Sequence, residues 1–376
     1  MTQTPANPQA SESTTTAGAQ TVQAPQLTAK DLGKHCLVTG GAGYVGSQLV
    51  QRLVAAGCKV RSLDVQAHSH EGDVETMVGD LRDYAAVQKA CEGIDTVFHT
   101  AALISTLQWC RPSVRRFVYD VNVQGSINVA RAAEEAGAKA MVHTSTFCVV
   151  LDRDGLDDQD ESLAYATRSH DLYTTTKIEA ERAVLSADRE GGLRTAALRP
   201  GGVWGPNVNS IMIRNFLQEL AKGKFKVLIG NGKANMDNTH VENLLDAQLL
   251  AARALRSKDC PAGGQAYFIV DEEQVNPLEW FRPLTEGLGE KFPKFYLPGG
   301  LMRFVGGMLE LAHMVGGPEP VLTRRAMRNM TESSSFRVDK ARRDLGYEPR
   351  YKRENGIPEL LPAAREYVES LRTQTA

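Results

Sequence analysis

Short apolar runs recur between residues 34 and 270 and alternate with longer segments whose apolar residues are spaced three and four apart. A short apolar run bounded by turn residues is typical of a buried strand, and the wider spacing is typical of a helix with one buried face. The pattern predicts strands at Cys36–Val38, Lys59–Leu63, Val74–Val78, Asp95–His99, Ala140–Thr144, Thr195–Leu198 and Ala266–Val270. Helices are expected from Val45 onward and over Tyr119–Glu135, which ends at Gly137. This alternation predicts an α/β fold with a doubly wound parallel sheet.

A glycine-rich turn, Gly40-Gly41-Ala-Gly43-Tyr-Val-Gly46, joins the first strand to its helix. We expect Gly41 and Gly43 to allow backbone angles and a close ligand approach that a Cβ atom would prevent. Gly46 lets the helix pack on the strand and points N–H groups at a pyrophosphate. Asp64, at the end of the second strand, is placed to bind adenosine ribose hydroxyls and to repel a 2′-phosphate. The turn predicts a dinucleotide site that prefers NAD to NADP, with a turn that binds no ligand as the minority alternative.

Two further strand ends belong to the same edge of the predicted sheet. Gly79-Asp80-Leu81 follows the third strand, where we expect groups that lie beside the adenine. Asp80 has a second interpretation as the cap of a helix that begins near Tyr84. Ala101 and Ala102 follow the fourth strand, and their small side chains leave room for a flat cofactor.

The composition limits the kinds of partner. The chain has 376 residues, 42% of them hydrophobic, and a formal net charge of −2, so it lacks the basic excess that would indicate nucleic acid as a partner. Its six cysteines form no CxxC pair and no metal-spaced cluster, so we expect neither metal nor disulfides. His68 and His70 are read as part of a solvated loop. Residues 1–30 lack the features of a signal or transit peptide, which predicts a disordered tail over 1–33 and a cytoplasmic location.

The second half of the chain carries no further dinucleotide signal. The proline and glycines of Arg199–Pro206 are expected to end regular structure. We predict an NAD-binding domain of residues 34–200 and 236–270, a substrate-binding cap of residues 201–235 and 271–352, and a C-terminal helix or tail over 353–376.

The segment Leu297–Gly317 is apolar enough to raise the question of a membrane. Arg303, Glu310 and His313 interrupt it, which argues against a spanning helix. Three alternatives remain: a cover over an apolar substrate, a helix that lies on a membrane surface, and an ordinary core helix.

Tyr173 and Lys177 are four residues apart and therefore share one face of a predicted helix. A phenol with a pKa of about 10 is a poor base at neutral pH, and a nearby ammonium favours its ionised form. Thr144, Ser145 and Thr146 follow the fifth strand, where a hydroxyl can orient a substrate oxygen. Taken alone, Tyr173 and Lys177 would be exposed surface residues, and Thr144 and Ser145 would belong to a strand end that bonds its own backbone. Their position after the glycine turn favours a catalytic role for Tyr173 and Lys177.

These motifs together resemble the extended short-chain dehydrogenase/reductases. The residues that carry the resemblance are Thr39-Gly-x-x-Gly43-x-x-Gly46, Asp64, Asp80, His99–Ala102, Asn122, Thr146, Tyr173-x-x-x-Lys177 and Arg199-Pro-Gly. Within that superfamily, the segments Asp171–Lys177, Leu198–Gly205, Gly264–Ile269 and Lys340–Pro349 resemble the 3β-hydroxysteroid dehydrogenase/Δ5-isomerase family, particularly its bacterial members. The resemblance implies a Rossmann-type sheet with a smaller, mainly helical C-terminal cap.

The resemblance also implies roles for single residues. Tyr173 would take the proton of a 3β-hydroxyl, and Lys177 would lower the pKa of Tyr173 and hold the nicotinamide ribose. Thr146, where the family commonly has serine, would orient the substrate oxygen, and Asn122 would support a proton relay. The residues expected to contact NAD are Gly40, Gly43, Tyr44, Val45, Gly46, Asp64, Asp80, Leu81, Ala101, Ala102, Tyr173, Lys177, Pro200 and Val203.

The leading hypothesis is an NAD-dependent oxidation of the 3β-hydroxyl of a steroid or sterol to the 3-ketone. Isomerisation from Δ5 to Δ4 is left open, because the proton shuttle that it needs is not identified. The rivals are a 4-carboxysterol 3-dehydrogenase, a nucleotide-sugar epimerase or dehydratase, and a non-catalytic NAD sensor. The expected partner is a small apolar substrate; peripheral membrane contact and a homodimer are left open.

Overall fold

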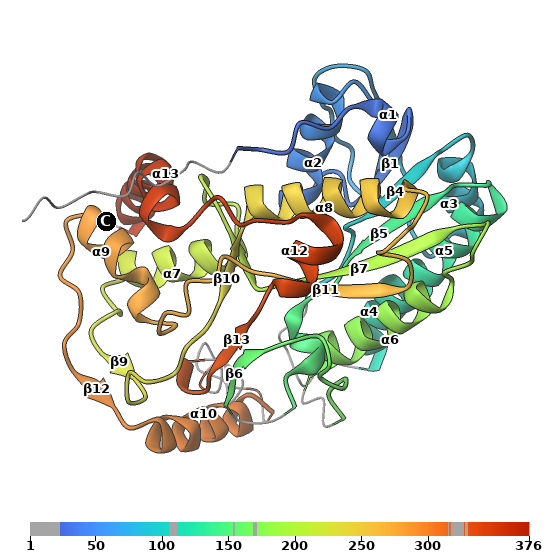
Figure 1. Ribbon diagram of the computed structural model, residues 1–376. Coiled ribbons are helices and arrows are strands. Elements are labelled where there is room, and N and C mark those ends of the chain that lie inside the picture. Colours follow the sequence, from blue (N-terminus) through green and yellow to red (C-terminus); the bar gives the residue numbers. More distant parts are fainter. Residues whose placement is uncertain are drawn as a thin grey trace, which may run out of the picture.

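The structure is a computed structural model that describes residues 23–104, 112–152, 155–167, 171–314, 316, 327 and 330–375. Its centre is a seven-stranded parallel sheet with the strand order β11-β7-β5-β4-β1-β2-β3 (Figure 1). The strands are β1 (His35–Thr39), β2 (Lys59–Asp64), β3 (Val74–Val78), β4 (Thr96–His99), β5 (Ala140–Thr144), β7 (Arg194–Pro200) and β11 (Gln265–Ile269). All seven predicted strands are present, and the predicted doubly wound parallel sheet is confirmed.

The strand order reverses at β1, which pairs with β2 on one side and β4 on the other. Thr39, the last residue of β1, is in register with Leu63 and with His99. The chain therefore leaves neighbouring strands in opposite directions at their carboxyl ends, which opens the crevice where ligands bind in sheets of this kind.

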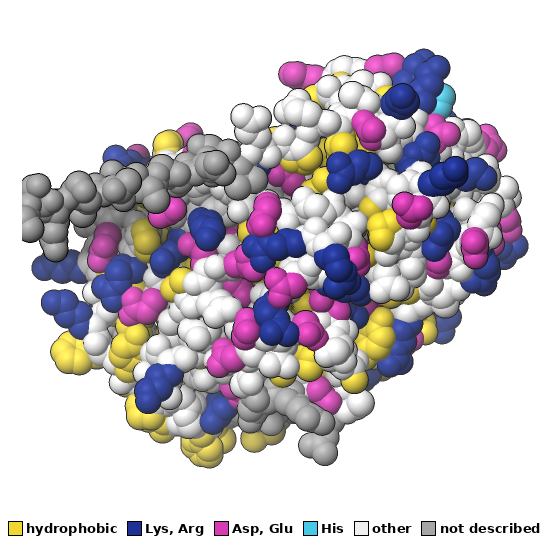
Figure 2. Space-filling model, in the orientation of Figure 1, with side chains coloured by type: hydrophobic (Ala, Val, Ile, Leu, Met, Phe, Trp, Pro, Cys, Tyr) yellow, Lys and Arg dark blue, Asp and Glu magenta, His cyan; other side chains and the backbone are white. Residues whose placement is uncertain are grey.

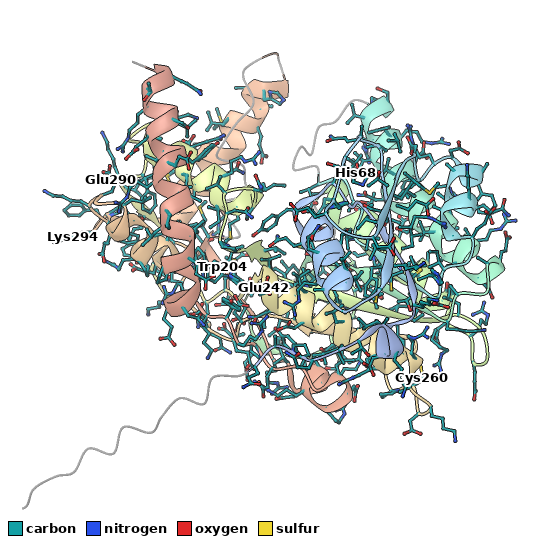
Figure 3. All side chains as sticks on the ribbon, turned by 90° about the horizontal axis from the view of Figure 1, so that it is seen from above. His68, Trp204, Glu242, Cys260, Glu290 and Lys294 are labelled. Carbon is teal, nitrogen blue, oxygen red and sulfur yellow. The ribbon has the colours of Figure 1, made fainter. Side chains whose placement is uncertain are left out.

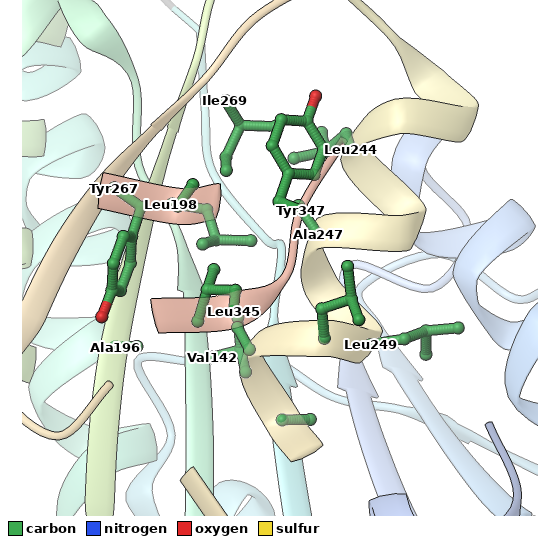
Figure 4. Close-up of a cluster of buried hydrophobic side chains, with 14 of the residues drawn as sticks. Val142, Ala196, Leu198, Leu244, Ala247, Leu249, Tyr267, Ile269, Leu345 and Tyr347 are labelled. Atoms are coloured by element: carbon green, nitrogen blue, oxygen red, sulfur yellow. The ribbon is translucent and has the colours of Figure 1, made fainter. Parts of the chain in front are cut away.

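Helices cover both faces of the sheet (Figure 1). One face carries α1 (Ala29–Leu32), α2 (Tyr44–Ala55), α8 (Val241–Arg256) and α12 (Asp339–Leu345). The other carries α3 (Tyr84–Cys91), α5 (Gly125–Glu135) and α6 (Leu172–Ser186). Figure 4 shows how the first layer forms: Val142 and Leu198 of the sheet meet Leu249 of α8 and Leu345 of α12, all nearly excluded from solvent. Burial of these side chains fixes the helices on the sheet.

The helix predicted over Tyr119–Glu135 begins earlier and is not uniform. It consists of α4 (Pro112–Tyr119), a π-helical turn η1 (Asp120–Gln124) and α5, and Gly137 follows with a positive φ of 78°. The predicted start was wrong because α4 buries only Val118, so few apolar positions mark it as a helix. The π turn η1 adds one residue to the helical turn. Such turns are frequent at functional sites, and this one contains Asn122.

The prediction that Arg199–Pro206 leaves regular structure was also wrong in part. β7 runs on through Pro200, which is in register with Ile269 of β11. A short strand β8 (Gly202–Trp204) then pairs in parallel with β10 (Asn238–His240). Proline is tolerated here because it ends the strand, and the next N–H, that of Gly201, donates to Thr239 Oγ1 at 2.8 Å.

The last residues of the predicted N-terminal tail form regular structure beside the sheet. Of the predicted tail over residues 1–33, residues 1–22 lie outside the described part of the chain. Residues 29–32 form α1, whose Leu32 is fully buried, and Thr96 Oγ1 donates to the Leu32 carbonyl at 2.6 Å. The tail prediction was therefore wrong at its end, because one apolar side chain in a polar stretch anchors it to the core.

The remaining elements extend to one side of the sheet in Figure 1. They are η2 (Phe147–Val150), β6 (Leu156–Gln159), α7 (Ile211–Ala221), β9 (Leu228–Ile229), η3 (Glu279–Phe281), α9 (Arg282–Gly287), β12 (Tyr296–Leu297), α10 (Gly299–Met314), β13 (Ser334–Phe336) and α13 (Arg353–Thr375). β9 pairs with β12 and β6 with β13, both in parallel. The predicted domain limits stay a prediction, and α12, which lies within the predicted cap, packs on α8 and β11 of the central sheet.

The apolar segment Leu297–Gly317 forms α10 over most of its length. Several of its large side chains face solvent, among them Phe304, which is 68% exposed, and Met308, which is 52% exposed. Hydrophobic side chains gather along the lower edge of Figure 2, over α10. None of the helices in the described part of the chain is long and apolar enough to cross a membrane.

Candidate active site

The glycine turn has the geometry of a loop that no larger residues could form. Gly40 has a positive φ of 74°, and its N–H donates to the Leu63 carbonyl at 2.8 Å. The conformational requirement therefore falls on Gly40, whereas Gly41 and Gly43, for which we expected it, have ordinary backbone angles. Gly43 is the N-cap of α2, so the first N–H groups of that helix open at the turn.

Steric contacts explain the other glycines. A Cβ atom on Gly46 would lie 2.1 Å from the carbonyl oxygen of Gly40, and one on Gly41 would lie 1.8 Å from Ser62 Oγ. A Cβ on Gly40 would lie 2.8 Å from the backbone of Ala101, which follows β4. The turn, the end of β2 and the end of β4 thus meet at the crevice, and the backbone there carries no large side chain that would occupy the ligand position.

Other residues expected to contact the cofactor lie around this crevice. Tyr44 and Val45 open α2, and the hydroxyl of Tyr44 is buried with no partner in the described part of the chain. Asp64 accepts from the N–H of Ala42 in the glycine turn at 3.1 Å and from that of Gln66 at 3.0 Å. The acid therefore lies beside the turn, as the sequence predicted for a group that binds a ribose.

Asp80 pairs with Arg82, whose guanidinium lies 2.6 Å away and lowers the pKa of the carboxyl group by hydrogen bonding. It does not cap the next helix: Asp83 does, accepting from the N–H of Ala85 at 3.0 Å. The carbonyl of Leu81 accepts from Asn128 Nδ2 at 2.8 Å, which ties the end of β3 to α5.

Three predicted contact residues lie at the ends of other strands. Ala102 follows β4 in the loop that leads to Leu103. Pro200 is buried at the end of β7, and Val203 lies in β8, where its carbonyl accepts from Ser210 Oγ at 2.6 Å.

Tyr173 and Lys177 lie on the first turns of α6. Asp171 caps this helix by accepting from the N–H of Thr174 at 2.9 Å, which fixes where the helix begins. Tyr173 is half-buried and Lys177 is 2% exposed, so the alternative of an exposed pair is wrong for the lysine. Burial lowers the pKa of Lys177 to about 8, with Glu181 acting in the opposite direction. Burial of a charged lysine costs free energy, and buried groups with shifted pKa values are concentrated at functional sites. Lys177 is therefore a candidate functional residue.

The Lys177 ammonium has two acceptors on β5. Its Nζ donates to the Thr144 carbonyl at 2.6 Å and lies 3.4 Å from His143 Nε2. The side chain of Thr144 faces the opposite layer, where its Oγ1 accepts from Gln248 Nε2 at 2.6 Å. Thr144 thus contributes its carbonyl, and its hydroxyl takes no part in the site.

Asn122 connects three elements. Its Oδ1 accepts from the N–H of Leu103 at 2.8 Å, and its Nδ2 donates to Thr176 Oγ1 at 3.0 Å. Thr176 in turn donates to the carbonyl of Tyr173 at 2.9 Å. The predicted relay residue therefore holds the loop after β4 and the first turn of α6 in fixed positions.

Thr146 lies at the N-terminus of η2, where its Oγ1 accepts from the N–H of Cys148 at 3.2 Å. This contact leaves the hydroxyl hydrogen of Thr146 for another acceptor, and the role of Thr146 stays a prediction. Ser145 is buried with no hydrogen-bond partner for its Oγ among the residues described. It is a second hydroxyl at the same strand end.

Sequence reasoning missed a buried ion pair next to Lys177. Arg199 and Glu181 lie 2.6 Å apart with side chains 5% and 0% exposed, and Tyr165 donates to Glu181 Oε1 at 2.8 Å. Glu181 is one helical turn beyond Lys177, a spacing that is visible in the sequence, but its partner on β7 is not. It also missed Asp271, which accepts from Trp204 Nε1 at 2.8 Å.

No metal site is found among the described residues, since they contain no group of three His, Cys, Asp or Glu side chains in suitable positions. His68 and His70, the pair that could have suggested one, both approach Ser62 Oγ through Nε2, at 2.7 and 3.2 Å. Figure 3 shows His68 in the same part of the molecule as the blue ribbon of β1, β2 and α2.

A pocket of about 480 Å³ opens beside the start of α10, where Gly230, Tyr296, Gly299 and Arg303 line it. None of the predicted site residues lines this pocket.

The parallel sheet with its glycine turn, and a buried lysine one helical turn after a tyrosine, define the chain as a short-chain dehydrogenase/reductase by fold and site. The model of the 3-beta hydroxysteroid dehydrogenase/isomerase family matches residues 37–298, which is more than half of the chain. The protein belongs to this family.

The similarity to its relatives extends over most of the chain and is not confined to one motif. A 3 beta-hydroxysteroid dehydrogenase/Delta 5-->4-isomerase of Mycobacterium tuberculosis is 39% identical over 346 residues, which cover 90% of this chain and 92% of the relative. A 3-beta-hydroxysteroid dehydrogenase of Mycolicibacterium neoaurum is 37% identical and covers 92% and 95%. A 3beta-hydroxysteroid-dehydrogenase/decarboxylase of Arabidopsis thaliana is 35% identical and covers 86% and 78%.

Solved structures share the fold. The crystal structure of gox2253 has a TM-score of 0.72 and 26% identity, and the match covers 89% of this chain and 98% of that one. MoeE5 in complex with UDP-glucuronic acid and NAD has a TM-score of 0.65 and 24% identity, with 89% and 99% covered. The second match shows that the same architecture also serves nucleotide sugars, so that the fold by itself does not select the substrate.

Proposed function

We propose that the protein oxidises the 3β-hydroxyl group of a steroid or sterol to the 3-ketone with NAD. The observation that carries the proposal is the buried Lys177, held by the Thr144 carbonyl one helical turn after Tyr173. The family and the names of its relatives supply the substrate class. Isomerisation of the product from Δ5 to Δ4 is part of the name of the mycobacterial relative and remains a prediction for this chain.

The residues divide the chemistry between them. Oxidation of the alcohol releases a proton from oxygen and a hydride from carbon; NAD, when bound, accepts the hydride. Tyr173 takes the proton, and the Lys177 ammonium favours the phenolate that can do so. Thr146, whose oxygen is already an acceptor, can donate its hydrogen to the substrate oxygen and orient it. Asn122 holds the first turn of α6 through Thr176, which keeps Tyr173 in position.

NAD rather than NADP is proposed because Asp64 lies against the glycine turn. A 2′-phosphate next to this carboxylate would be repelled, whereas ribose hydroxyls can donate to it. We expect kcat/KM to be at least about tenfold higher with NAD, and Asp64→Ala to narrow the difference, since one charge pair accounts for a change of this size. Equal kcat/KM values for both cofactors in the unchanged protein would contradict the proposal.

A substrate panel tests the reaction against its rivals. Purified protein with NAD is incubated with pregnenolone, cholesterol, a 4-carboxysterol and a UDP-hexose, and the reduced nicotinamide is followed by absorbance. Turnover of pregnenolone or cholesterol supports the proposal. Release of carbon dioxide from the 4-carboxysterol alone would favour the decarboxylating activity for which the Arabidopsis relative is named. Turnover of the UDP-hexose alone, or of nothing, would overturn it.

Contact with a membrane surface is proposed for α10. Its exposed Leu301, Phe304, Met308 and Leu311 would reach the interface where an apolar substrate is concentrated. In cell fractionation we expect high salt or alkaline carbonate to release the protein from membranes. Release by detergent alone would contradict this. A homodimer also stays a prediction, which sedimentation can test.

A further inference from the structure

Two histidines lie side by side in the sheet next to Lys177. His143 of β5 and His99 of β4 are partners in the strand register, and their rings stack with centroids 5.2 Å apart. Both are buried, and both face the layer of α5 and α6. Neither histidine has a role in the proposed reaction, and the two differ in their hydrogen-bond partners.

His99 is fully engaged in structural hydrogen bonds. Its Nδ1 lies 2.7 Å from Thr39 Oγ1 and its Nε2 lies 2.9 Å from Ser126 Oγ. Ser126 donates its own hydrogen to the Asn122 carbonyl at 2.6 Å, so its oxygen can only accept from His99. The proton of His99 is therefore on Nε2, and Nδ1 accepts from Thr39. Burial lowers the pKa of His99 to about 3, so the ring carries no second proton.

His143, by contrast, has an unprotonated ring nitrogen that faces the Lys177 ammonium. Its Nε2 is 3.4 Å from Lys177 Nζ, and its Nδ1 is buried with no partner in the described part of the chain. An ammonium has only donors, so a favourable contact requires an unprotonated Nε2 and places the ring proton on Nδ1. We propose that His143 is a positioning residue that accepts a hydrogen bond from the Lys177 ammonium and keeps it charged beside Tyr173.

The charges around Lys177 explain why a neutral acceptor suits this place. Glu181, on the same helix, is the nearest carboxylate that acts on Lys177, but its oxygens are bound by Arg199 and Tyr165. A carboxylate in direct contact would hold the ammonium more firmly, yet its negative charge would oppose ionisation of Tyr173. An imidazole lone pair stabilises the cation without adding that charge. Burial and the charge of Lys177 lower the pKa of His143, so the ring stays neutral.

Removal of this acceptor should raise the pKa of Tyr173. Without it, the ammonium loses one of its two acceptors and the pKa of Lys177 falls below its present value of about 8. A larger fraction of Lys177 is then neutral at the pH where Tyr173 ionises, and the pKa of Tyr173 rises. A hydrogen bond to a charged group stabilises that charge, and only part of the effect passes to a coupled neighbour, so we expect the pKa of Tyr173 to rise by about one unit.

The experiment measures Tyr173 directly. The near-ultraviolet absorbance of the phenolate is titrated in the NAD complex of each protein, and the same titration of its Tyr173→Phe counterpart is subtracted. His143→Leu removes the acceptor, and His143→Gln offers an amide oxygen at the distance of Nε2. We expect the pKa of Tyr173 to rise by about one unit in His143→Leu and to return to within a few tenths of a unit in His143→Gln.

The control is His99→Leu, an equally buried histidine whose hydrogen bonds go to Thr39 and Ser126 and not to Lys177. This variant should have a lower melting temperature and an unchanged pKa of Tyr173. An unchanged pKa in His143→Leu overturns the inference. The inference is also overturned if the pKa of Tyr173 shifts as much in His143→Gln as in His143→Leu, or if it shifts equally in His99→Leu. Either result would mean that His143 acts only through packing. The inference rests on the proposed roles of Tyr173 and Lys177, but the titration needs no steroid, so a failed substrate panel leaves it testable.

Discussion

Some residues with a proposed role in the reaction also lower the stability of the fold. Lys177 is the clearest case, because the burial that holds it in the site also lowers its pKa and so disfavours the charged form that its proposed role requires. The Tyr173 and Lys177 pair could be predicted from spacing in the sequence. The acceptors of Lys177 could not, since His143 and Thr144 are more than 30 residues away along the chain.

Tyr173→Phe tests the proposed base. The substitution removes one oxygen and keeps the ring, so the melting temperature and the affinity for NAD should stay close to those of the unchanged protein. Turnover of the steroid should fall by about 10² or more, the scale of a lost acid/base group. Steady-state kinetics and NAD titration measure both quantities. Near-normal turnover would refute the assignment.

Lys177→Met tests the structural cost of the lysine. The folded-state pKa of about 8 lies below the ordinary value of 10.5, so below pH 8 the buried charge costs a constant free energy. As pH rises from 8 to 10.5, the unfolded chain binds more protons than the folded one, and this cost disappears. We therefore expect the variant to be more stable to urea by about 1–2 kcal/mol at neutral pH, after allowance for the unpaired Thr144 carbonyl.

The difference between the two proteins should shrink towards high pH, and turnover by the variant should be lost. Lys139→Met, a substitution of an exposed lysine, provides the control and should show no such pH dependence. A Lys177→Met protein that is less stable at neutral pH would show that the lysine stabilises the fold and that its burial carries no net cost.

Elements are held at the site by close backbone contacts. The glycine turn, the end of β2 and the start of α2 approach so closely that side chains are excluded, and α6 is held to η1 through Asn122 and Thr176. The sequence predicted the turn and the helix after it. It did not predict the π-helical turn η1, because one extra residue in a turn of five residues, Asp120–Gln124, is too short a change to be seen in the apolar pattern.

Gly46→Ala tests the packing of α2. The added methyl would lie 2.1 Å from the Gly40 carbonyl, a backbone atom that cannot move away without displacing the turn. We expect the affinity for NAD to fall by at least about tenfold and the unfolding free energy by about 1–3 kcal/mol, as for other overpacked sites. Gly300→Ala is a matched control, because a Cβ there meets nothing within 4 Å. Equal behaviour of the two variants would contradict this account of the turn.

At the scale of the whole molecule, buried polar groups join strands and helices that are far apart in the sequence. Asp271 is 1% exposed and accepts from Trp204 Nε1, from the N–H of His240 and from Asn243 Nδ2 at 2.7–2.8 Å. Asn243 also bonds Arg350 and Tyr351 through its Oδ1. β8, β10 and α8 therefore meet at one carboxylate, and Asn243 connects it to the segment before α13. Figure 3 labels Trp204 of β8 and Glu242 of α8.

Asp271→Ala should loosen the junction of β8, β10 and α8. Three buried donors lose their acceptor, which costs roughly 3 kcal/mol or more of unfolding free energy. Trp204 is one of them, so the tryptophan fluorescence should change before the far-ultraviolet circular dichroism when the variant is heated. Asp259→Ala, at an exposed turn, should change neither. Coincident transitions at the original temperature in Asp271→Ala would show that this junction is not needed.

The sequence by itself determined the order and type of the sheet elements, the glycine turn with Asp64, and the Tyr173–Lys177 pair. These features depend on periodicity, on backbone freedom and on spacing within one helix, all of which are local. Only the tertiary structure decided which groups surround them: His143 and Thr144 at Lys177, Arg199 at Glu181, and Asp271 at the junction of β8, β10 and α8. A buried polar side chain must find its partner on whichever strand or helix packs against it, and that neighbour is set by the fold of the whole chain.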